Sequence, residues 1–198
     1  MRNNYVLIDW ENVQPESMEL LDHEHVQVRV FVGAMQKDIS IEKAAALQPM
    51  GKRVEYIRMA RSGKNALDFH IAFYIGQIAA IDTTAYFHII AKDKGFDPLI
   101  EHLKSRKIFC ARSVSILDVP FVKAATATTP EARAAVILEQ FALYPKTRPA
   151  TRKTLGSTIK NKFGKLLSDD DVDAVVKCLE KSKRISVDGT KVQHIDVV

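Results

Sequence analysis

Apolar and polar positions alternate in two different periods along the first 120 residues. Five runs rich in β-branched and aromatic residues have the length and composition of buried strands, at residues 5–9, 26–33, 53–59, 85–91 and 107–112. Four stretches between them favour helices, at residues 15–22, 40–50, 65–81 and 98–105. The third is the clearest, with apolar residues spaced for one helix face at Leu67, Ile71, Tyr74, Ile75 and Ile78. This alternation predicts βαβ units and an α/β fold with a doubly wound, mainly parallel sheet.

The chain changes character after a small, polar stretch at residues 122–132. Residues 130–143, 151–167 and 169–182 favour helices, the last led by Ser168 and an acidic first turn. Residues 184–197 alternate around Asp188-Gly189, a strong hairpin signal. Three helices and a hairpin are the order of a small winged-helix-like α+β domain. We therefore expect domains at residues 1–122 and 131–198, joined by a linker at residues 123–130.

Composition indicates the class of protein and the compartment in which it is expected. The chain has 198 residues, 46% hydrophobic and 27% charged, as in ordinary globular proteins. Its two cysteines, Cys110 and Cys178, are far apart in apolar surroundings, so neither a disulfide framework nor a zinc site is expected. No signal-peptide pattern opens the sequence, and no apolar run approaches the roughly 20 residues of a membrane span. We expect a soluble, cytoplasmic protein with no membrane partner.

The formal charge of +5 is unevenly distributed. Residues 1–122 hold 15 Lys and Arg against 15 Asp and Glu, whereas residues 123–198 hold 14 against 9, which accounts for all of the +5. The basic stretch, residues 146–165, has no acid and seven cations: Lys146, Arg148, Arg152, Lys153, Lys160, Lys162 and Lys165. Such a segment favours a nucleic-acid-binding surface, and a merely solvated helix face is the open alternative.

Carboxylates collect where function is expected in a doubly wound sheet, at the carboxyl ends of strands. Asp9 and Asp93 follow the first and fourth predicted strands, and Asp97 comes four residues after Asp93. Asp68 lies in the first turn of the long helix, beside its apolar stripe. Converging carboxylates repel one another unless a cation neutralises them, so these residues predict an oxygen-ligand site for Mg²⁺ or Mn²⁺. Such a site can activate a water against a phosphodiester.

Several of these residues have a structural alternative. Asn12 could cap a helix running through Pro15, and Asp97, just before Pro98, could cap the helix that follows. Asp68 could simply favour the N-terminus of its own helix. In "DWEN", Asp9 could be a turn residue.

The roles of two further residues are left open. Glu11 is an undecided member of the site, because side chains two positions apart diverge once a helix begins. Lys64 lies in a glycine-containing turn and could contact phosphate or simply be solvated. The "SGK" around it lacks the spacing of a phosphate-cradling loop, and no serine or cysteine stands in a nucleophile motif.

Three segments in this order resemble the NYN family of PIN-like ribonuclease domains: "DWEN" at residues 9–12, "KNALD" at residues 64–68 and "DKGFDPL" at residues 93–99. The resemblance covers about residues 3–120. It implies a Rossmann-like sheet and a metal-dependent nuclease, often acting on RNA, whose site aspartates correspond to Asp9, Asp68 and Asp93. Many members carry a second acid where this chain has Gly95, and Asp97 is the candidate substitute. Without it, a degenerate, non-catalytic nucleic-acid-binding regulator is the alternative.

The second part of the chain loosely resembles the OST-HTH/LOTUS type of winged helix, which is found joined to NYN domains. That resemblance implies RNA or protein-partner binding, and it makes the basic stretch a candidate substrate tether. An acidic site repels a polyanion, which a separate basic module would offset in a salt-dependent way. The combined prediction is an Mg²⁺- or Mn²⁺-dependent nuclease, with an endoribonuclease favoured; RNA is preferred to DNA as the substrate, but that choice and the oligomeric state are left open.

Overall fold

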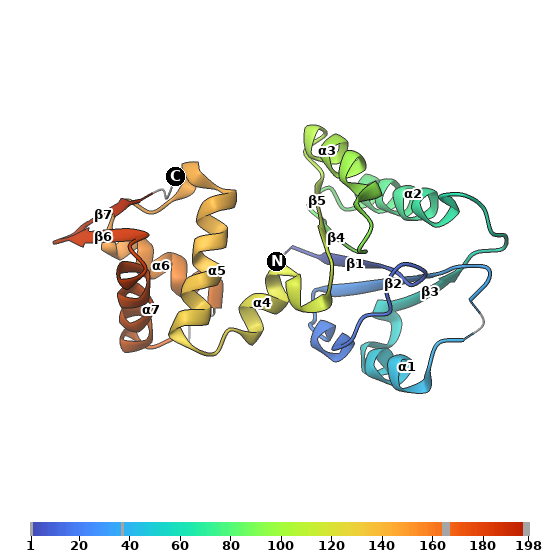
Figure 1. Ribbon diagram of the computed structural model, residues 1–198, viewed down its shortest axis with the longest axis horizontal. Helices are drawn as coiled ribbons and strands as arrows, with labels where there is room; N and C mark the ends of the chain where they lie inside the picture. Colours follow the sequence, from blue (N-terminus) through green and yellow to red (C-terminus); the bar gives the residue numbers. More distant parts are fainter. Residues whose placement is uncertain (1, 37, 164–166, 196–198) are drawn as a thin grey trace. The chain divides into compact units, whose positions relative to one another are not determined.

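The computed structural model describes residues 2–36, 38–163 and 167–195. They form two compact units, Met1–Val122 (unit 1) and Lys123–Val198 (unit 2), drawn in Figure 1. Buried apolar side chains form two clusters in unit 1, one on each face of a sheet, and a separate cluster in unit 2. Each unit therefore has its own core and is described by itself.

Unit 1 is built on five parallel strands in the order β3-β2-β1-β4-β5. They are β1 (Asn4–Asp9), β2 (Val26–Val32), β3 (Val54–Arg58), β4 (Tyr86–Ile90) and β5 (Phe109–Ser113). All five coincide with the predicted strands to within two residues, which confirms the α/β class and the parallel sheet. The chain adds β2 and β3 on one side of β1 and then crosses to the other side of β1, where it adds β4 and β5. This reversal makes a crevice at the carboxyl ends of β1 and β4 the expected site in such a fold.

Alternation along β1 explains the layers on the two faces of the sheet. Val6 and Ile8 point into one core cluster, and Leu7 points into the other. Helices α2 (Ala66–Ile81) and α3 (Asp97–Ser105) cover the Leu7 face, and α1 (Ile41–Leu47) covers the opposite one (Figure 1). Helix α4 (Pro120–Thr126) and the 3-10 turns η1 (Met18–Leu21) and η4 (Ile116–Asp118) also pack there. Both faces of β1 are thus buried from solvent, which explains why its sequence is a continuous apolar run.

Two predicted helices of unit 1 are shorter than expected. Residues 15–22 form only η1, because Ser17 adopts a left-handed conformation with φ 59° and breaks the turn. Residues 40–50 form α1, which ends at Leu47, two residues before Pro49. The chain continues there as the 3-10 segment η2 (Gln48–Arg53). Proline removes a helical donor, which accounts for this change of geometry.

Unit 2 has the order expected of a winged-helix-like module: α5 (Pro130–Leu143), η5 (Pro145–Thr147), α6 (Arg152–Phe163), α7 (Asp169–Lys181), β6 (Ile185–Asp188) and β7 (Lys191–His194). Ser168 begins α7 with a capping box, exchanging hydrogen bonds with Asp171. The antiparallel hairpin β6–β7 turns at Gly189, whose φ of 55° suits a residue without Cβ. The predicted helices and hairpin of this unit are confirmed over the described residues; residues 164–166 of the expected helix 151–167 and residues 196–197 of the expected hairpin segment lie outside them.

The predicted linker at residues 123–130 is mostly structured. Its first four residues complete α4, which ends at Thr126, because Ala124 and Ala125 are strong helix formers. Thr129 then caps α5, its hydroxyl accepting the Ala132 N–H at 3.2 Å. No helix within the described ranges is both long and apolar enough to cross a membrane.

Candidate active site

Asp9 ends β1, and the residue as a whole is almost entirely buried, at 4% exposure. Burial raises the pKa of this carboxyl to about 6; the backbone N–H of Asn12, 2.9 Å from Oδ1, partly opposes the rise. The negative charges of Asp68 and Glu11 raise the pKa further. A buried carboxylate surrounded by other acids has an unusually high affinity for a positive charge, whether a proton or a metal ion.

Asp68 lies in the first turn of α2, where sequence periodicity indicated. Burial is the main cause of its raised pKa, followed by the charges of Asp93 and Glu11. The helix begins after Asn65, which adopts a left-handed conformation with φ 58° and makes no side-chain cap. Asp9, Glu11 and Asp68 line one open cleft of about 250 Å³, which we call the carboxylate cleft. The structure thus brings these three predicted residues together.

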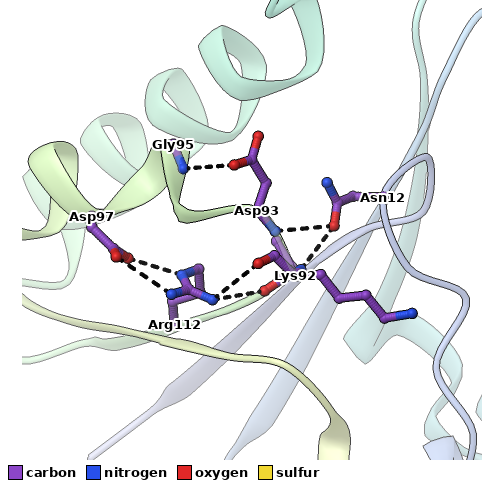
Figure 2. Close-up of polar contacts among 7 residues, drawn as sticks. Asn12, Lys92, Asp93, Gly95, Asp97 and Arg112 are labelled. Atoms are coloured by element: carbon purple, nitrogen blue, oxygen red, sulfur yellow. Dashed lines mark hydrogen bonds and ion pairs between the residues drawn. The ribbon is translucent and has the colours of Figure 1, made fainter.

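Asp93 follows β4 and is exposed. Its carboxylate accepts the Gly95 N–H at 3.0 Å and caps the 3-10 turn η3 (Lys94–Phe96). The side-chain oxygen of Asn12 accepts the backbone N–H groups of Lys92 and Asp93 at 2.8 and 3.2 Å (Figure 2). The alternative of Asn12 as a helix cap is therefore wrong. No helix begins there, and its side-chain oxygen instead accepts hydrogen bonds from the segment that follows β4.

Asp97 does not join the other carboxylates. Its two oxygens face the guanidinium of Arg112, with Oδ1 2.9 Å from Nε, whereas Asp93 turns to Gly95 (Figure 2). The hydrogen bond from Arg112 holds the pKa of Asp97 below its usual range. Nor does its side chain cap α3, because Asp97 is already the first helical residue and the cap position is Phe96. A ligand role for Asp97 would require this ion pair to open.

Sequence reasoning missed Arg112. Its guanidinium also donates to the carbonyls of Ala91 and Lys92, at 3.2 and 3.4 Å, on the segment that leads into Asp93 (Figure 2). This segment is therefore held from both sides, by Asn12 on its N–H groups and by Arg112 on its carbonyls. The available signal was a cation near the end of the fifth strand, in "FCARS".

Gly33 was also missed. A Cβ at this position would lie 2.8 Å from Oε2 of Glu11, so the Glu11 carboxylate approaches this backbone in a way that only glycine permits. The side chain of Gln36 accepts the Gly33 N–H at 3.1 Å and donates to the Trp10 carbonyl at 2.8 Å. The segment after β2 thereby holds the backbone directly before Glu11. The signal was the glycine that ends the second predicted strand, residues 26–33.

The ligand chemistry of the carboxylate cleft fits a hard divalent cation. In the parts of the chain that the structure describes, no three or more Asp, Glu, His or Cys side chains are close enough together to hold a metal as they stand. Mg²⁺ keeps several waters, however, and needs only one or two protein carboxylates. Asp9 and Asp68 satisfy this minimum with oxygen ligands alone. A cation there would relieve the repulsion that Asp68 exerts on Asp9.

Lys64 is exposed on the loop before α2. Its two sequence neighbours, Gly63 and Asn65, line the carboxylate cleft. Lys64 therefore lies on the loop at the edge of the cleft, although it is not itself one of the lining residues.

The basic stretch of unit 2 is partly neutralised by acids on α7. Arg152 pairs with Asp173, and Lys160 pairs with Asp169 at 2.7 Å. Burial lowers the pKa of Lys162. The ion pairs between α6 and α7 thus neutralise the charges of Arg152 and Lys160, which the sequence alone suggested were available for binding.

The other cations of the stretch differ in exposure. Arg148 is half-buried and donates to the Phe141 carbonyl at 3.0 Å. Lys146 and Lys153 are exposed, and Lys165 lies outside the described residues. Lys146 and Lys153 are therefore the members with charges open to a partner.

A comparison with known protein families identifies the family of unit 1. A family model described as "PIN domain" matches residues 3–113, which is more than half of the 198 residues. No curated protein and no solved structure matches the chain. PIN domains have a nuclease-type fold, and their nuclease activity generally depends on a divalent metal ion. The parallel sheet and the carboxylate cleft of unit 1 are consistent with such a domain. The chain belongs to the PIN domain family.

Proposed function

We propose that the chain is a metal-dependent endoribonuclease that hydrolyses phosphodiester bonds at the carboxylate cleft. The observation that carries this proposal is the pairing of Asp9 with Asp68 on one cleft, although the charge of Asp68 raises the pKa of Asp9. A fold gains no stability by holding buried carboxylates against one another. Such an arrangement is expected where a cation is bound during function.

In this proposal Asp9, Asp68 and Asp93 hold Mg²⁺ or Mn²⁺, with Glu11 as a further acid. The bound metal supplies a Lewis acid and an activated water for attack on phosphorus. Because the pKa of Asp9 is raised only to about 6, its carboxylate is mostly ionised at neutral pH and would be available as a metal ligand. Asn12 and Arg112 orient the segment that carries Asp93. Lys64, on the rim, contacts a phosphate of the substrate.

The finer assignments rest on the motifs. We place unit 1 in the NYN group, because "DWEN", "KNALD" and "DKGFDPL" occur in its order, and we expect RNA rather than DNA as substrate. Unit 2 is proposed as an OST-HTH/LOTUS-like nucleic-acid-binding module. The exposed Lys146 and Lys153 support that role. Two free cysteines, Cys110 and Cys178, suit a reducing cytoplasm.

The second candidate is a non-catalytic RNA- or DNA-binding regulator that keeps the PIN fold. Gly95 stands where many relatives have an acid, and the Asp97 carboxylate is paired with Arg112. Within the described residues, no group of three or more potential ligands is assembled. This candidate predicts RNA binding that needs no metal and leads to no cleavage.

Cleavage of labelled RNA by the full chain separates the two candidates. We expect cleavage with Mn²⁺ or Mg²⁺, none with a chelator, and loss of cleavage in Asp9→Asn, Asp68→Asn and Asp93→Asn while circular dichroism stays unchanged. Asp170→Asn is the matched control, since this exposed aspartate lies in unit 2. Cleavage that persists in all three variants, or that ignores the chelator, would refute the nuclease assignment. Tight binding without cleavage would support the regulator.

A further inference from the structure

Two large aromatic side chains lie exposed on α2, the helix whose first turn carries Asp68 of the carboxylate cleft. Phe69 and Phe73 are 69% and 63% exposed, although the opposite side of the same helix is buried through Leu67 and Ile71. They are four residues apart and therefore share one helix face, a single turn from each other. Phe69 directly follows Asp68, which lines the cleft. Single exposed apolar residues are common, but an aromatic pair beside a site indicates binding.

Positive charges lead up to this aromatic pair. Residues 56–67 contain Arg58, Arg61 and Lys64 and no acid. All three cations are exposed, and none forms an ion pair with any residue in the described ranges. Their charge is therefore open to a polyanion, unlike that of Arg152 and Lys160 in unit 2.

We infer that unpaired nucleotides of an RNA substrate stack on Phe69 and Phe73 while the flanking phosphates contact Arg58, Arg61 and Lys64, which makes this surface a second RNA-binding site in addition to the carboxylate cleft. The inference rests on the proposed function, because it assumes that RNA reaches the carboxylate cleft. Aromatic rings next to a basic surface are the usual means of binding single strands without regard to sequence. Bases in a duplex are already stacked and paired, and cannot cover the rings.

The competing occupant is a second copy of this chain. The exposed apolar face continues along α2 to Ile81, at 85% exposure, but Gly76 and Ala80 between them offer little area. The two phenyl rings expose roughly 100 to 170 Å² each. A stable interface needs about 800 Å² from each partner. The large exposed rings also cluster at the cleft end of the helix, beside the free cations, which favours RNA.

Fluorescence anisotropy with the full chain in a chelator tests this inference without cleavage. The probes are a short unstructured RNA and a hairpin of the same base composition. We compare wild type with Phe69→Ala/Phe73→Ala, with Phe69→Leu/Phe73→Leu, which keeps apolar area without an aromatic face, and with the control Ile81→Ala. Both positions are exposed, so the variants should fold, which circular dichroism checks.

We expect both double variants to raise the Kd for unstructured RNA about tenfold or more, with little effect on the hairpin and none from Ile81→Ala. Leucine variants that bind like wild type, or wild type that binds no RNA under chelation, would overturn the inference. So would a dimer in sedimentation that both Phe→Ala and Ile81→Ala dissociate while RNA binding is unchanged. If the rings bind RNA but no metal supports cleavage, the inference stands and the nuclease assignment fails.

Discussion

The side-chain oxygen of Asn12 lies 3.2 Å from the backbone nitrogen of Asp93 and accepts its hydrogen bond, although 81 residues separate the two in sequence. The backbone N–H of Asn12 donates in turn to the carboxylate of Asp9. One residue thus connects the acid at the end of β1 with the acid that follows β4. The relative position of these two carboxylates depends on it.

Asn12→Ala should therefore reduce activity more than stability. Lys92 and Asp93 are exposed, so water can replace the lost acceptor, and unfolding should become easier by only about 1 kcal/mol or less. A shift of Asp93 should lower kcat about tenfold to a hundredfold. Single-turnover cleavage and urea unfolding measure the two effects. Asn161→Ala, at an exposed position in unit 2, is the control. Wild-type kcat in Asn12→Ala would contradict a positioning role.

Asp97→Ala should leave metal affinity close to wild type, because the Asp97 carboxylate is paired with Arg112 and turned away from the cleft. Asp93→Ala should weaken Mn²⁺ binding by more than the roughly tenfold typical of losing an outer-shell partner. Calorimetric Mn²⁺ titration compares the two variants. Equal losses would mean that Asp97 leaves Arg112 and replaces the acid missing at Gly95.

Sequence periodicity was sufficient for the sheet and for the principal acids. The central strands β1 and β4 are nearly continuous apolar runs, as parallel strands buried on both faces tend to be. The edge strands β3 and β5 contain charged residues and were recognised by their β-branched and aromatic residues. Asp9 was predictable because an acid ends one such run, and Asp68 because it flanks the apolar stripe of α2. These signals are local, which is why a single sequence contains them.

The remaining parts of the site depend on contacts between distant residues. Arg112 engages Asp97 across 15 residues and Asn12 engages Asp93 across 81, so neither contact has a local signature. The helix expected at residues 15–22 failed because Ser17 adopts a left-handed conformation, which serine rarely does. Neutralisation of Arg152 by Asp173 likewise required the packing of α6 on α7.

Asp9→Asn should stabilise the metal-free protein above pH 6. Folding raises the pKa of Asp9 from 3.8 to about 6, so the native state holds the proton more tightly than the unfolded state. The resulting penalty on stability builds as pH rises from 3.8 to about 6 and is constant above that. Asparagine mimics the protonated form. A pKa change from 3.8 to about 6 corresponds to about 3 kcal/mol, and solvent screening at the open cleft should leave asparagine an advantage on the order of 2 kcal/mol at pH 8.

Thermal unfolding in a chelator, at pH values from 4 to 8, measures this difference, which should vanish near pH 4. Mn²⁺ should reverse the order at pH 8 by stabilising only wild type. A less stable Asp9→Asn variant at pH 8 without metal would show that burial does not penalise the charge.

Gly33→Ala tests the undecided role of Glu11. The new methyl group would lie within 2.9 Å of two atoms of the Glu11 carboxyl group, which must turn away. Because the end of a flexible side chain can move, we expect little loss of stability. Activity should fall as in Glu11→Gln, and the double variant should be no worse than either single one. Gly76→Ala, where no atom meets the added Cβ, is the control. Additive losses would separate Gly33 from Glu11.

The basic stretch should contribute to RNA binding only through its exposed members. Lys146→Ala/Lys153→Ala should reduce the slope of log affinity against log salt by about 1.4, since each phosphate contact on a single strand contributes about 0.7. Arg152→Ala/Lys160→Ala should change the slope less, because Asp173 and Asp169 already hold these charges. The second pair should instead lower the melting temperature, since it leaves both aspartates without their partners. Binding to unstructured RNA in a chelator, measured over a series of KCl concentrations, tests this contrast. Equal slopes for the two double variants would mean that RNA displaces the aspartates and that α6 binds as a whole.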